Sequence, residues 1–483
     1  MPVANHADLA QARRALRRHF GFADFRAPQV AVVRAVLGGR DVLGVLPTGA
    51  GKSVCFQIPA LLAPGLTIVI TPLVSLMEDQ VARALERGIA AATIHAHRKA
   101  EPDRQLRDRI ACGALKLLYI SPERLEADSL HRILGASLVS RIAVDEAHCV
   151  SEWGHDFRPA YRRIAAFRLR IGHPPCVALT ATATPETRDD VVSNLELREP
   201  VALVWPVDRP NLRWEVTRAS STAEAARTLV RAVRKTPGAA ILYVQTRRGA
   251  VRLADALRRR GIIAAGYHAG MRAASRQATQ EAFVSGQLRA VCATTAFGMG
   301  IDHPSVRLVG HLGRPGSLEA YVQEAGRAGR DGASARCLLV ARKGDEAFHR
   351  AMHARAWPPE RLARAVWRSL PPGEPVDREH LARLIKTTRL DDVLNVISFL
   401  ERHDAVRRQE GLPDGSWVRG PAALWPRVAT ALSWGRGRAR TRLAAMREYV
   451  ESPGCRRQVI ARYFENGMPS CGGCDRCDGT APF

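Results

Sequence analysis

A glycine-rich turn with the sequence PTGAGKS occupies residues 47–53, directly after an apolar run at Asp41–Leu46. A turn of this kind between a strand and a helix lets backbone N–H groups approach a phosphate at the positive end of the helix dipole. Lys52 would reach the β- and γ-phosphates of a nucleotide, and Ser53 would ligate Mg²⁺. The strict pattern has glycine where Leu46 stands, but GAGKS is intact. The residues of this turn assigned to the nucleotide are Thr48, Gly49, Gly51, Lys52 and Ser53.

Two adjacent carboxylates, Asp145 and Glu146, end a second apolar run at Ile142–Val144. Asp145 would hold Mg²⁺ through water, and Glu146 would orient and deprotonate an attacking water molecule. A solvated turn is the alternative interpretation. The preceding apolar run and His148 downstream favour a hydrolytic site that shares its metal with Ser53.

Four of the ten cysteines follow the spacing C-x₁₅-C-x₂-C-x₂-C near the end of the chain. Four thiolates at this spacing suit tetrahedral Zn²⁺, and a Gly-Gly pair permits a tight knuckle between them. Reduced free thiols are the alternative. Because no ligand position remains open, we expect a structural zinc site. Its ligands would be Cys455, Cys471, Cys474 and Cys477.

The chain is strongly basic, with 72 Lys and Arg against 47 Asp and Glu and a net charge of +25 among 483 residues. Such a chain favours polyanionic partners, of which nucleic acid and an acidic membrane surface are the obvious ones. The uncharged run at Ser53–Met77 is long enough to span a bilayer, but prolines and a glycine interrupt it, so we expect buried core. The N-terminal residues lack the apolar segment of a secretory signal. We therefore expect nucleic acid as the partner, no membrane, and a cytoplasmic location, associated with the nucleoid in a bacterium.

Apolar strand-like runs alternate with helical patterns over the first 345 residues, which predicts parallel, doubly wound sheets. The alternation restarts after about residue 210, so we expect two tandem α/β domains at 1–207 and 208–345. The strands expected in the first are Asp41–Leu46, Leu66–Thr71, Lys116–Ser121, Arg141–Asp145 and Cys176–Thr180. Those expected in the second are Ala239–Gln245, Ala264–His268, Ala290–Thr294, Val306–His311 and Ala335–Val340.

The pattern changes after Arg342. Helical patterns are expected at Arg378–Lys386 and Asp391–Arg402, and strand-like pieces at Ala405–Gln409 and Ser416–Arg419 flank a turn signal, Pro-Asp-Gly. Helix, helix and hairpin are the outline of a winged helix, with an arbitrary helical appendage as the alternative. We expect a winged-helix-like DNA-binding region at 346–440 and a zinc-binding module at 441–483.

Several segments together resemble the RecQ family of superfamily 2 helicases, over about residues 15–342. They are residues 20–29, 71–80, 119–125, 149–161, 178–184, 293–302 and 323–332, beside the glycine-rich turn and the paired carboxylates. The resemblance implies two RecA-like domains that enclose ATP. It also implies nucleotide contacts from Phe20, Arg26, Gln29, Gly300 and Asp302.

The segment 149–161, with the sequence CVSEWGHDFRPAY, is similar to the aromatic-rich loop of RecQ enzymes. Its aromatic rings would stack on single-strand bases, with a guanidinium beside them for phosphate or stacking. Clustered aromatic residues are usually core, but charged residues interleave with these. The residues assigned on this resemblance to DNA binding, or to its coupling with hydrolysis, are Trp153, His155, Phe157, Arg158, Tyr161, Thr180, Thr182 and Gln323.

The segment 323–332, QEAGRAGRDG, resembles the final helicase motif. The resemblance implies that Arg327 and Arg330 reach the γ-phosphate from the second domain and stabilise charge in the transition state. The segment near the end of the chain that carries the four spaced cysteines is also similar to the RecQ zinc module. In typical members that module directly follows the core, whereas about 100 residues separate the two here.

The sequence therefore predicts an ATP-dependent DNA helicase that uses ATP, Mg²⁺ and Zn²⁺ and serves recombination and repair. Its 3′→5′ polarity is implied by the resemblance alone. Expected partners are single-stranded DNA, tailed or forked duplexes and a single-strand-binding protein, with a monomeric chain. Two alternatives stay open: a DNA-stimulated ATPase that translocates without unwinding, and a zinc and winged-helix DNA-binding regulator.

Overall fold

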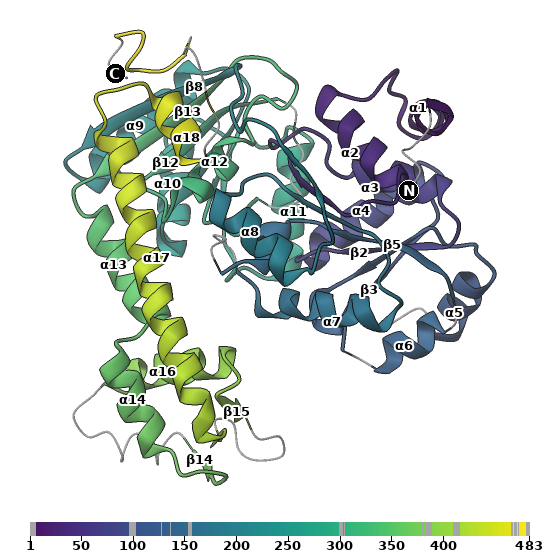
Figure 1. Cartoon of the computed structure of the whole chain (residues 1–483). Coiled ribbons are helices and arrows are strands. Elements are labelled where there is room, and N and C mark those ends of the chain that lie inside the picture. The colour runs from purple at the N-terminus through teal and green to yellow at the C-terminus, as the bar shows by residue number, and fades with distance from the viewer. Residues whose placement is uncertain are drawn as a thin grey trace. The chain divides into compact units, whose positions relative to one another are not determined.

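The computed structural model separates into two compact units, residues 1–341 together with 449–483, and residues 342–448. It describes residues 6–95, 103–126, 128–135, 137–152, 157–298, 303, 305–377, 381, 389–408, 416–464, 467, 471 and 473–479. The first unit contains two α/β domains, each built on its own sheet (Figure 1). The two units are treated separately below.

The first domain is built on a seven-stranded parallel sheet with the order β3-β4-β2-β5-β6-β1-β7. Its strands are β1 (Val42–Val45), β2 (Leu66–Ile70), β3 (Ala91–Ile94), β4 (Leu117–Ile120), β5 (Val139–Val144), β6 (Cys176–Thr180) and β7 (Val201–Val204). Central strands are buried on both faces, as parallel sheets require. In β2, Ile68 and Ile70 pack into one core and Val69 into the other.

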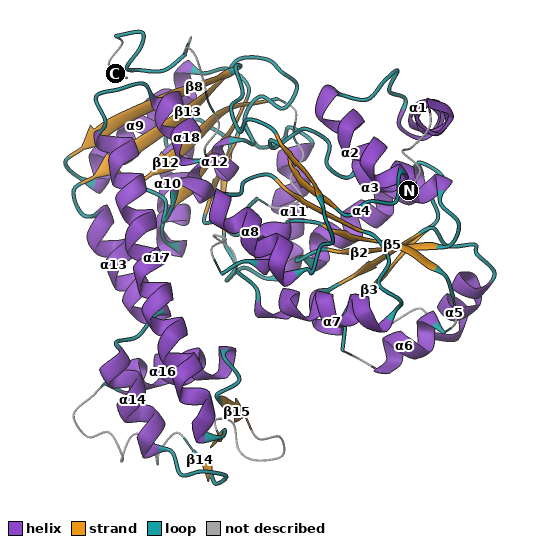
Figure 2. Ribbon diagram, in the orientation of Figure 1, coloured by secondary structure: helices purple, strands orange, loops and turns teal. Residues whose placement is uncertain are grey.

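Helices cover both faces of this sheet, so that its strands lie in a middle layer (Figure 2). They are α1 (His6–Phe20), α2 (Ala27–Leu37), α3 (Val54–Leu62), α4 (Val74–Glu86), α5 (Asp103–Ala111), α6 (Asp128–Leu134), α7 (Arg163–Arg170) and α8 (Pro185–Asn194). The uncharged run at Ser53–Met77 contains the buried helix α3 and the buried strand β2, as predicted. Among the described residues, we find no helix with the length and apolar character needed to span a membrane.

The second domain has a six-stranded sheet with the order β10-β11-β9-β12-β13-β8. Its strands are β8 (Leu212–Ala219), β9 (Ala239–Val244), β10 (Ala264–Tyr267), β11 (Ala290–Ala293), β12 (Val306–Leu312) and β13 (Ala335–Arg342). Its helices are α9 (Thr222–Lys235), α10 (Arg247–Arg258), α11 (Ala273–Val284) and α12 (Leu318–Ala325). The four pairings from β10 through β13 are parallel.

The predicted fold class, two tandem parallel-sheet α/β domains, is confirmed, and all ten predicted strands are present. The sequence missed β3, β7 and β8. All three lie at the edges of their sheets. The composition of β8, LRWEVTRA, is in addition half polar.

The second unit combines helices with a small antiparallel sheet of order β14-β16-β15. Its elements are α13 (Asp345–Ala356), α14 (Glu360–Ser369), β14 (Pro375–Val376), α16 (Leu390–Arg402), β15 (Val406–Arg408), β16 (Trp417–Arg419) and α17 (Trp425–Glu451), the last of which continues into the first unit. A core that includes Trp367, Phe399 and Trp417 joins the helices to the sheet. Apart from Leu381, the predicted helix 378–386 lies outside the described residues, as does the turn 413–415.

A buried ion pair holds the N-terminal end of β1 in the first domain. Arg168 of α7 donates from Nη2 to both carboxylate oxygens of Asp41, at 2.7 and 2.8 Å, and both side chains are almost fully buried. Asp41 also accepts backbone N–H groups from Cys176 and Arg198. The pair therefore ties together α7, β6 and the strand that leads into the glycine-rich turn.

We predict that Arg168→Met lowers the free energy of unfolding by about 3–5 kcal/mol, because it leaves the Asp41 carboxylate buried without its cation. Urea denaturation measures the change. Arg170→Met on the same helix is the matched control, since Arg170 is exposed, and it should change stability by less than about 0.5 kcal/mol. Equal effects of the two substitutions would contradict this account of the pair.

Candidate functional site

The glycine-rich turn leaves the carboxyl end of β1, and α3 begins directly after it at Val54. Gly49 and Gly51 have φ angles of 85° and 77°, the left-handed region that favours glycine. A Cβ on Gly51 would lie 2.5 Å from Gln29 Nε2. Conformation and packing therefore both demand glycine there, as in a turn built to bind a phosphate.

Two residues predicted to contact the nucleotide are hydrogen-bonded to the carbonyl groups of the turn. Gln29 donates from Nε2 to the carbonyls of Ala50 and Gly51 at 2.9 and 3.2 Å, and its Oε1 accepts from the Arg26 backbone N–H. Arg26 also donates from Nη1 to the carbonyl of Gly49. These two side chains fix the shape of the phosphate-binding turn.

A ring surface lies at the end of α1. The rings of Phe20 and Phe22 stack at 6.5 Å, and the Arg87 guanidinium lies 4.7 Å from the centroid of Phe20. Phe22 is 52% exposed. The sequence analysis assigned Phe20 to the nucleotide. The structure adds Phe22 as the more exposed of the two rings.

Asp145 follows β5 and is buried, with 5% of its surface exposed. Gln80 of α4 donates from Nε2 to Asp145 Oδ2 at 3.2 Å, a contact that sequence reasoning did not assign. Burial and the adjacent Glu146 charge hold the pKa of Asp145 above its usual range, and the Lys52 ammonium offsets them only in part. A buried carboxylate beside a second, partly buried one suits a divalent cation.

Glu146 has a φ of 49°, unusual for a residue with a side chain, and this backbone conformation turns it away from the axis of β5. Its Oε2 lies 3.4 Å from His148 Nδ1, which lies 2.8 Å from Thr180 Oγ1 at the end of β6. Thr180 in turn donates to the carbonyl of Thr182 at 3.3 Å. A chain of polar contacts therefore connects the predicted catalytic base with the predicted coupling threonines, and its His148–Thr180 and Thr180–Thr182 links are hydrogen bonds.

The predicted DNA loop is described in part. Trp153 and His155 lie outside the described residues. Phe157 is partly buried beneath the Arg162 guanidinium, 5.2 Å from its centroid, and Arg158 donates to the carbonyl of Pro72 at 2.6 Å.

Tyr161 requires a correction. Its ring is fully buried, and its hydroxyl donates to the carbonyl of Asp145 at 3.2 Å. The ring therefore has no exposed face on which a DNA base could stack. Its hydroxyl instead holds the backbone at Asp145. The charged residues that interleave with the aromatic rings of this segment therefore did not identify Tyr161 as a core residue.

One of the two predicted arginines, Arg330, approaches the glycine-rich turn from the second domain. A Cβ on Gly49 would lie 3.6 Å from Arg330 Cγ, and one on Gly326 would lie 3.0 Å from Thr48. Arg327, by contrast, is buried and donates to the carbonyl of Gly298. Gln323 on α12 is partly buried, and Gly300 and Asp302 lie outside the described residues. A small cavity at this junction is lined by Pro47, Thr48, Ala181, Thr182, Val207, Arg209, Leu212, Trp214, Val322 and Gly326.

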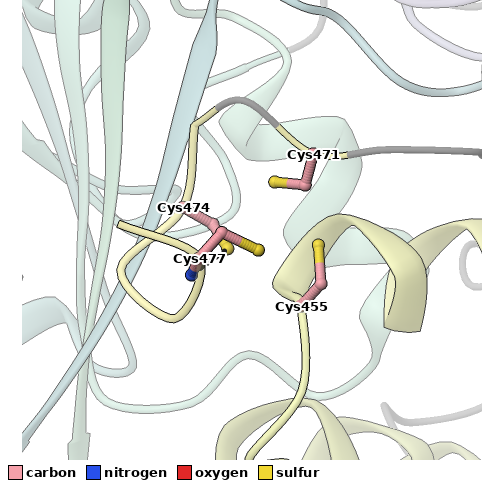
Figure 3. Close-up of side chains that lie close together, drawn as sticks. All are labelled: Cys455, Cys471, Cys474 and Cys477. Carbon is pink, nitrogen blue, oxygen red and sulfur yellow. Dashed lines mark hydrogen bonds between the residues drawn. The ribbon is translucent and has the colours of Figure 1, made fainter. Parts of the chain in front are cut away.

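The four predicted zinc ligands come together. The sulfur atoms of Cys455, Cys471, Cys474 and Cys477 all lie within 4.8 Å of one another (Figure 3). Sulfur atoms around a tetrahedral zinc at 2.3 Å would be ~3.8 Å apart, so the cluster fits the ion after small adjustments. Burial opposes ionisation of Cys474, but backbone N–H groups, including that of Cys477, lower the pKa of this thiol.

The knuckle of this cluster joins the edge of the second sheet. The Trp214 backbone of β8 donates to the carbonyl of Gly473 at 3.1 Å, and Asp475 donates back to the Trp214 carbonyl at 3.0 Å. Cys455 precedes α18 (Arg456–Tyr463), the helix that lies against this domain in Figure 1. The cysteine cluster is therefore continuous with the second α/β domain.

Three family descriptions match the chain. Residues 26–191 match a DEAD/DEAH box helicase domain, residues 223–332 a helicase conserved C-terminal domain, and residues 430–478 a RecQ zinc-binding domain. The first implies ATP with Mg²⁺. The last, together with the cysteine cluster, implies Zn²⁺.

Named relatives agree with these matches. The chain is 41% identical over 333 residues to the ATP-dependent DNA helicase RecQ of Haemophilus influenzae, covering 69% of this chain and 54% of the relative. It is 39% identical over 339 residues to the probable ATP-dependent DNA helicase RecS of Bacillus subtilis, covering 70% and 68%. With the rat ATP-dependent DNA helicase Q5 it shares 34% identity over 492 residues, covering 97% and 44%. The chain thus spans about half the length of the Haemophilus relative.

Solved structures with the same fold include the Mycobacterium smegmatis helicase Lhr bound to single-stranded DNA and AMP-PNP, at a TM-score of 0.55 and 20% identity, covering 88% of this chain and 62% of that one. Yeast Dbp5 bound to RNA and ADP BeF3 aligns at a TM-score of 0.58 and 16% identity, covering 72% and 93%. The two sheets and their facing motifs define a superfamily 2 helicase core. Within that class, the zinc module and the relatives place the chain in the RecQ family.

We predict that Asp145→Asn raises the Tm of the Mg²⁺-free protein at pH 8. The pKa of Asp145 is higher in the folded protein than the ordinary value near 4, so the ionised carboxylate lowers the free energy of unfolding. This loss of stability is recovered as the pH falls from above the folded-state pKa toward the ordinary value, because the carboxyl group becomes protonated. The gain in Tm should therefore shrink between pH 8 and pH 5. Added Mg²⁺ should stabilise the parent chain more than the variant.

Thermal unfolding at several pH values measures this effect. Asp189→Asn is the control, because Asp189 lies exposed on α8. A lower Tm for Asp145→Asn than for the parent chain at pH 8 without Mg²⁺ would contradict the burial cost assigned to this carboxylate.

For the cysteine cluster, we predict that Cys474→Ser releases zinc and exposes residues 452–479 to protease, because the ion ties the knuckle to α18. Metal analysis and limited proteolysis are the measurements. Cys112→Ser, at an exposed cysteine outside the cluster, should retain zinc. Full zinc content in the Cys474→Ser protein would show that the four sulfurs do not form the site.

Proposed function

We propose that the chain is an ATP-dependent DNA helicase that couples hydrolysis to movement along a single strand and to duplex unwinding, in recombination and repair. The supporting observation is the approach of Arg330 to the glycine-rich turn that carries Lys52, beside the buried Asp145 and the partly buried Glu146. The relatives named above are themselves called ATP-dependent DNA helicases. The 3′→5′ polarity rests on the family resemblance.

In this proposal each residue acts on one part of the nucleotide. Lys52 and the N–H groups of the turn bind the phosphates, and Ser53 and Asp145 hold Mg²⁺, which neutralises phosphate charge when bound. Glu146 accepts the proton of the attacking water. Arg330 stabilises the charge that develops on the γ-phosphoryl group, while Arg327 holds the segment around Gly298.

Coupling to DNA would pass through the polar chain at the ends of β5 and β6. His148 joins Glu146 to Thr180, and Thr180 joins Thr182, which lines the junction between the two domains. A change in the position of Glu146 would therefore be passed to the second domain. The loop around Phe157 would contact the strand.

The second unit supports a DNA-binding role of its own. We infer a winged helix from α16 and the antiparallel strands β15 and β16, which correspond to the second predicted helix and the predicted hairpin, with α14 and β14 beside them. Six arginines against one glutamate at residues 421–450 add positive charge for phosphate. We retain 1–207, 208–345, 346–440 and 441–483 as the proposed domains.

A second candidate function is a DNA-stimulated ATPase that translocates without unwinding. The observation that favours it is the separate unit at residues 342–448, which lies along the sequence between the helicase core and the zinc module. A pure DNA-binding regulator has less support, because Lys52, Asp145 and Glu146 are all retained. We further propose a monomer, a cytoplasmic and nucleoid-associated location, and a single-strand-binding protein as partner.

We predict that Lys52→Ala lowers the kcat of ATP hydrolysis by roughly 10²–10³-fold, the range for loss of one charge-stabilising donor, and leaves DNA affinity within twofold. Steady-state turnover and fluorescence anisotropy measure the two effects. Lys343→Ala, an exposed lysine outside the site, is the control. Retained turnover in the Lys52→Ala protein would overturn the assigned nucleotide site.

Strand displacement separates the two candidate functions. With ATP and Mg²⁺ we expect unwinding of a duplex with a 3′ tail and not of one with a 5′ tail. DNA-stimulated turnover without displacement would favour the translocase. Absence of turnover with any nucleic acid would reject both enzymatic proposals.

A further inference from the structure

Arg457 lies two residues after the zinc ligand Cys455 and is buried, with 4% of its side chain exposed. Its guanidinium reaches into the loop at residues 208–212, before β8. Nη1 lies 3.1 Å from Asp208 Oδ2, and Nη2 donates to the carbonyls of Pro210 and Leu212 at 2.8 and 2.7 Å. One side chain of the zinc module therefore fixes the backbone of a loop that belongs to the second domain.

The same loop holds the turn that carries the catalytic arginine. Arg209 donates from Nη1 to the carbonyl of Gly326 at 2.7 Å and from Nη2 to that of Gly329. Asn211 Nδ2 donates to the carbonyls of Gly329 and Ala333, both at 2.8 Å. Arg330 directly follows Gly329, so these bonds fix the backbone from which its side chain extends.

A second connection runs along the same path. Arg456 donates to Asp475 at 3.0 Å, and Asp475 joins the Trp214 backbone of β8. The rings of Trp214 and Tyr321 on α12 lie 5.4 Å apart. Both connections start within two residues of the zinc ligand Cys455 and end at the helix or turn that precedes or carries the arginines.

From this chain of contacts we propose that Arg457 is a positioning residue for ATP hydrolysis. It holds loop 208–212, and through Arg209 and Asn211 it sets the position of the turn at residues 326–330. The zinc ion, by fixing Cys455 at the start of α18, then influences how well Arg330 meets the γ-phosphoryl group. The inference deepens the proposed function and rests on it for its kinetic part.

A merely structural role for Arg457 would predict a loss of stability or of zinc. The positioning role predicts a loss of kcat with the binding of ATP intact, since Arg330 acts on charge that develops in the transition state. It also predicts greater mobility of the turn, which can be measured without any turnover.

The test compares Arg457→Lys with Arg462→Lys, an exposed arginine on the same helix. Lysine keeps the charge at position 457 and loses the planar fork that reaches several carbonyls. We expect Arg457→Lys to retain zinc and to lower kcat roughly ten- to hundredfold, with KM for ATP within twofold. Amide hydrogen exchange at residues 326–332 should be faster than in the parent chain, and Arg462→Lys should match the parent chain in every measurement.

Asn211→Ala is the second variant, because it loosens the same turn without touching the zinc module. It should reproduce the faster exchange and the lower kcat with full zinc content. If Arg457→Lys loses zinc or fails to fold, this variant still tests whether loop 208–212 positions the turn. Unchanged exchange, or unchanged kcat despite faster exchange, would overturn the proposal.

If the parent chain hydrolyses no ATP with any nucleic acid, the proposed function is contradicted, whereas the positioning role of Arg457 is not. The exchange measurement stays decisive in that case. Zinc removal by a chelator should speed exchange at residues 326–332 if the module holds the turn, and unchanged exchange would refute that connection.

Discussion

Phosphate binding by backbone N–H groups requires a turn whose shape is held without help from its own side chains. At residues 47–53 that support comes from neighbours: Gln29 and Arg26 take up the carbonyl groups, and β1 lies between β6 and β7. The ion pair of Arg168 with Asp41 fixes the other end of the same strand. The paired carboxylates and the incoming Arg330 all meet this one turn, so its rigidity sets the geometry of the whole site.

The chemistry of the site was largely predictable, because phosphate and metal binding restrict residue type at fixed spacing. Lys52, the Asp145–Glu146 pair and the four clustered cysteines follow from that restriction. The strands in the interior of each sheet were predictable because they form continuous apolar runs, whereas the three missed strands, β3, β7 and β8, all lie at sheet edges. Tyr161 was misassigned because alternation with charged residues does not determine which ring faces inward.

Arg457 could not be predicted from its position in the sequence. Most of its partners are backbone carbonyls, which exist at every residue and leave no trace in the sequence, and the contact to Leu212 joins positions 245 apart. The contacts of Gln80 and Arg209 could not be predicted for related reasons, because each residue contacts a partner that only the order of the strands in the sheet brings close. The adjacent basic pair Arg456-Arg457 on a short buried helix was the single available signal.

The bonds from Arg457 to main-chain oxygens carry a consequence for how this junction can change over evolutionary time. They constrain the path of loop 208–212 and place no demand on the side chains of Pro210 or Leu212 themselves. Substitutions there can accumulate while the contact survives, and no compensating change at position 457 is required. Statistical covariation between positions, which detects pairs that change together, would therefore overlook this contact even in a deep set of related sequences.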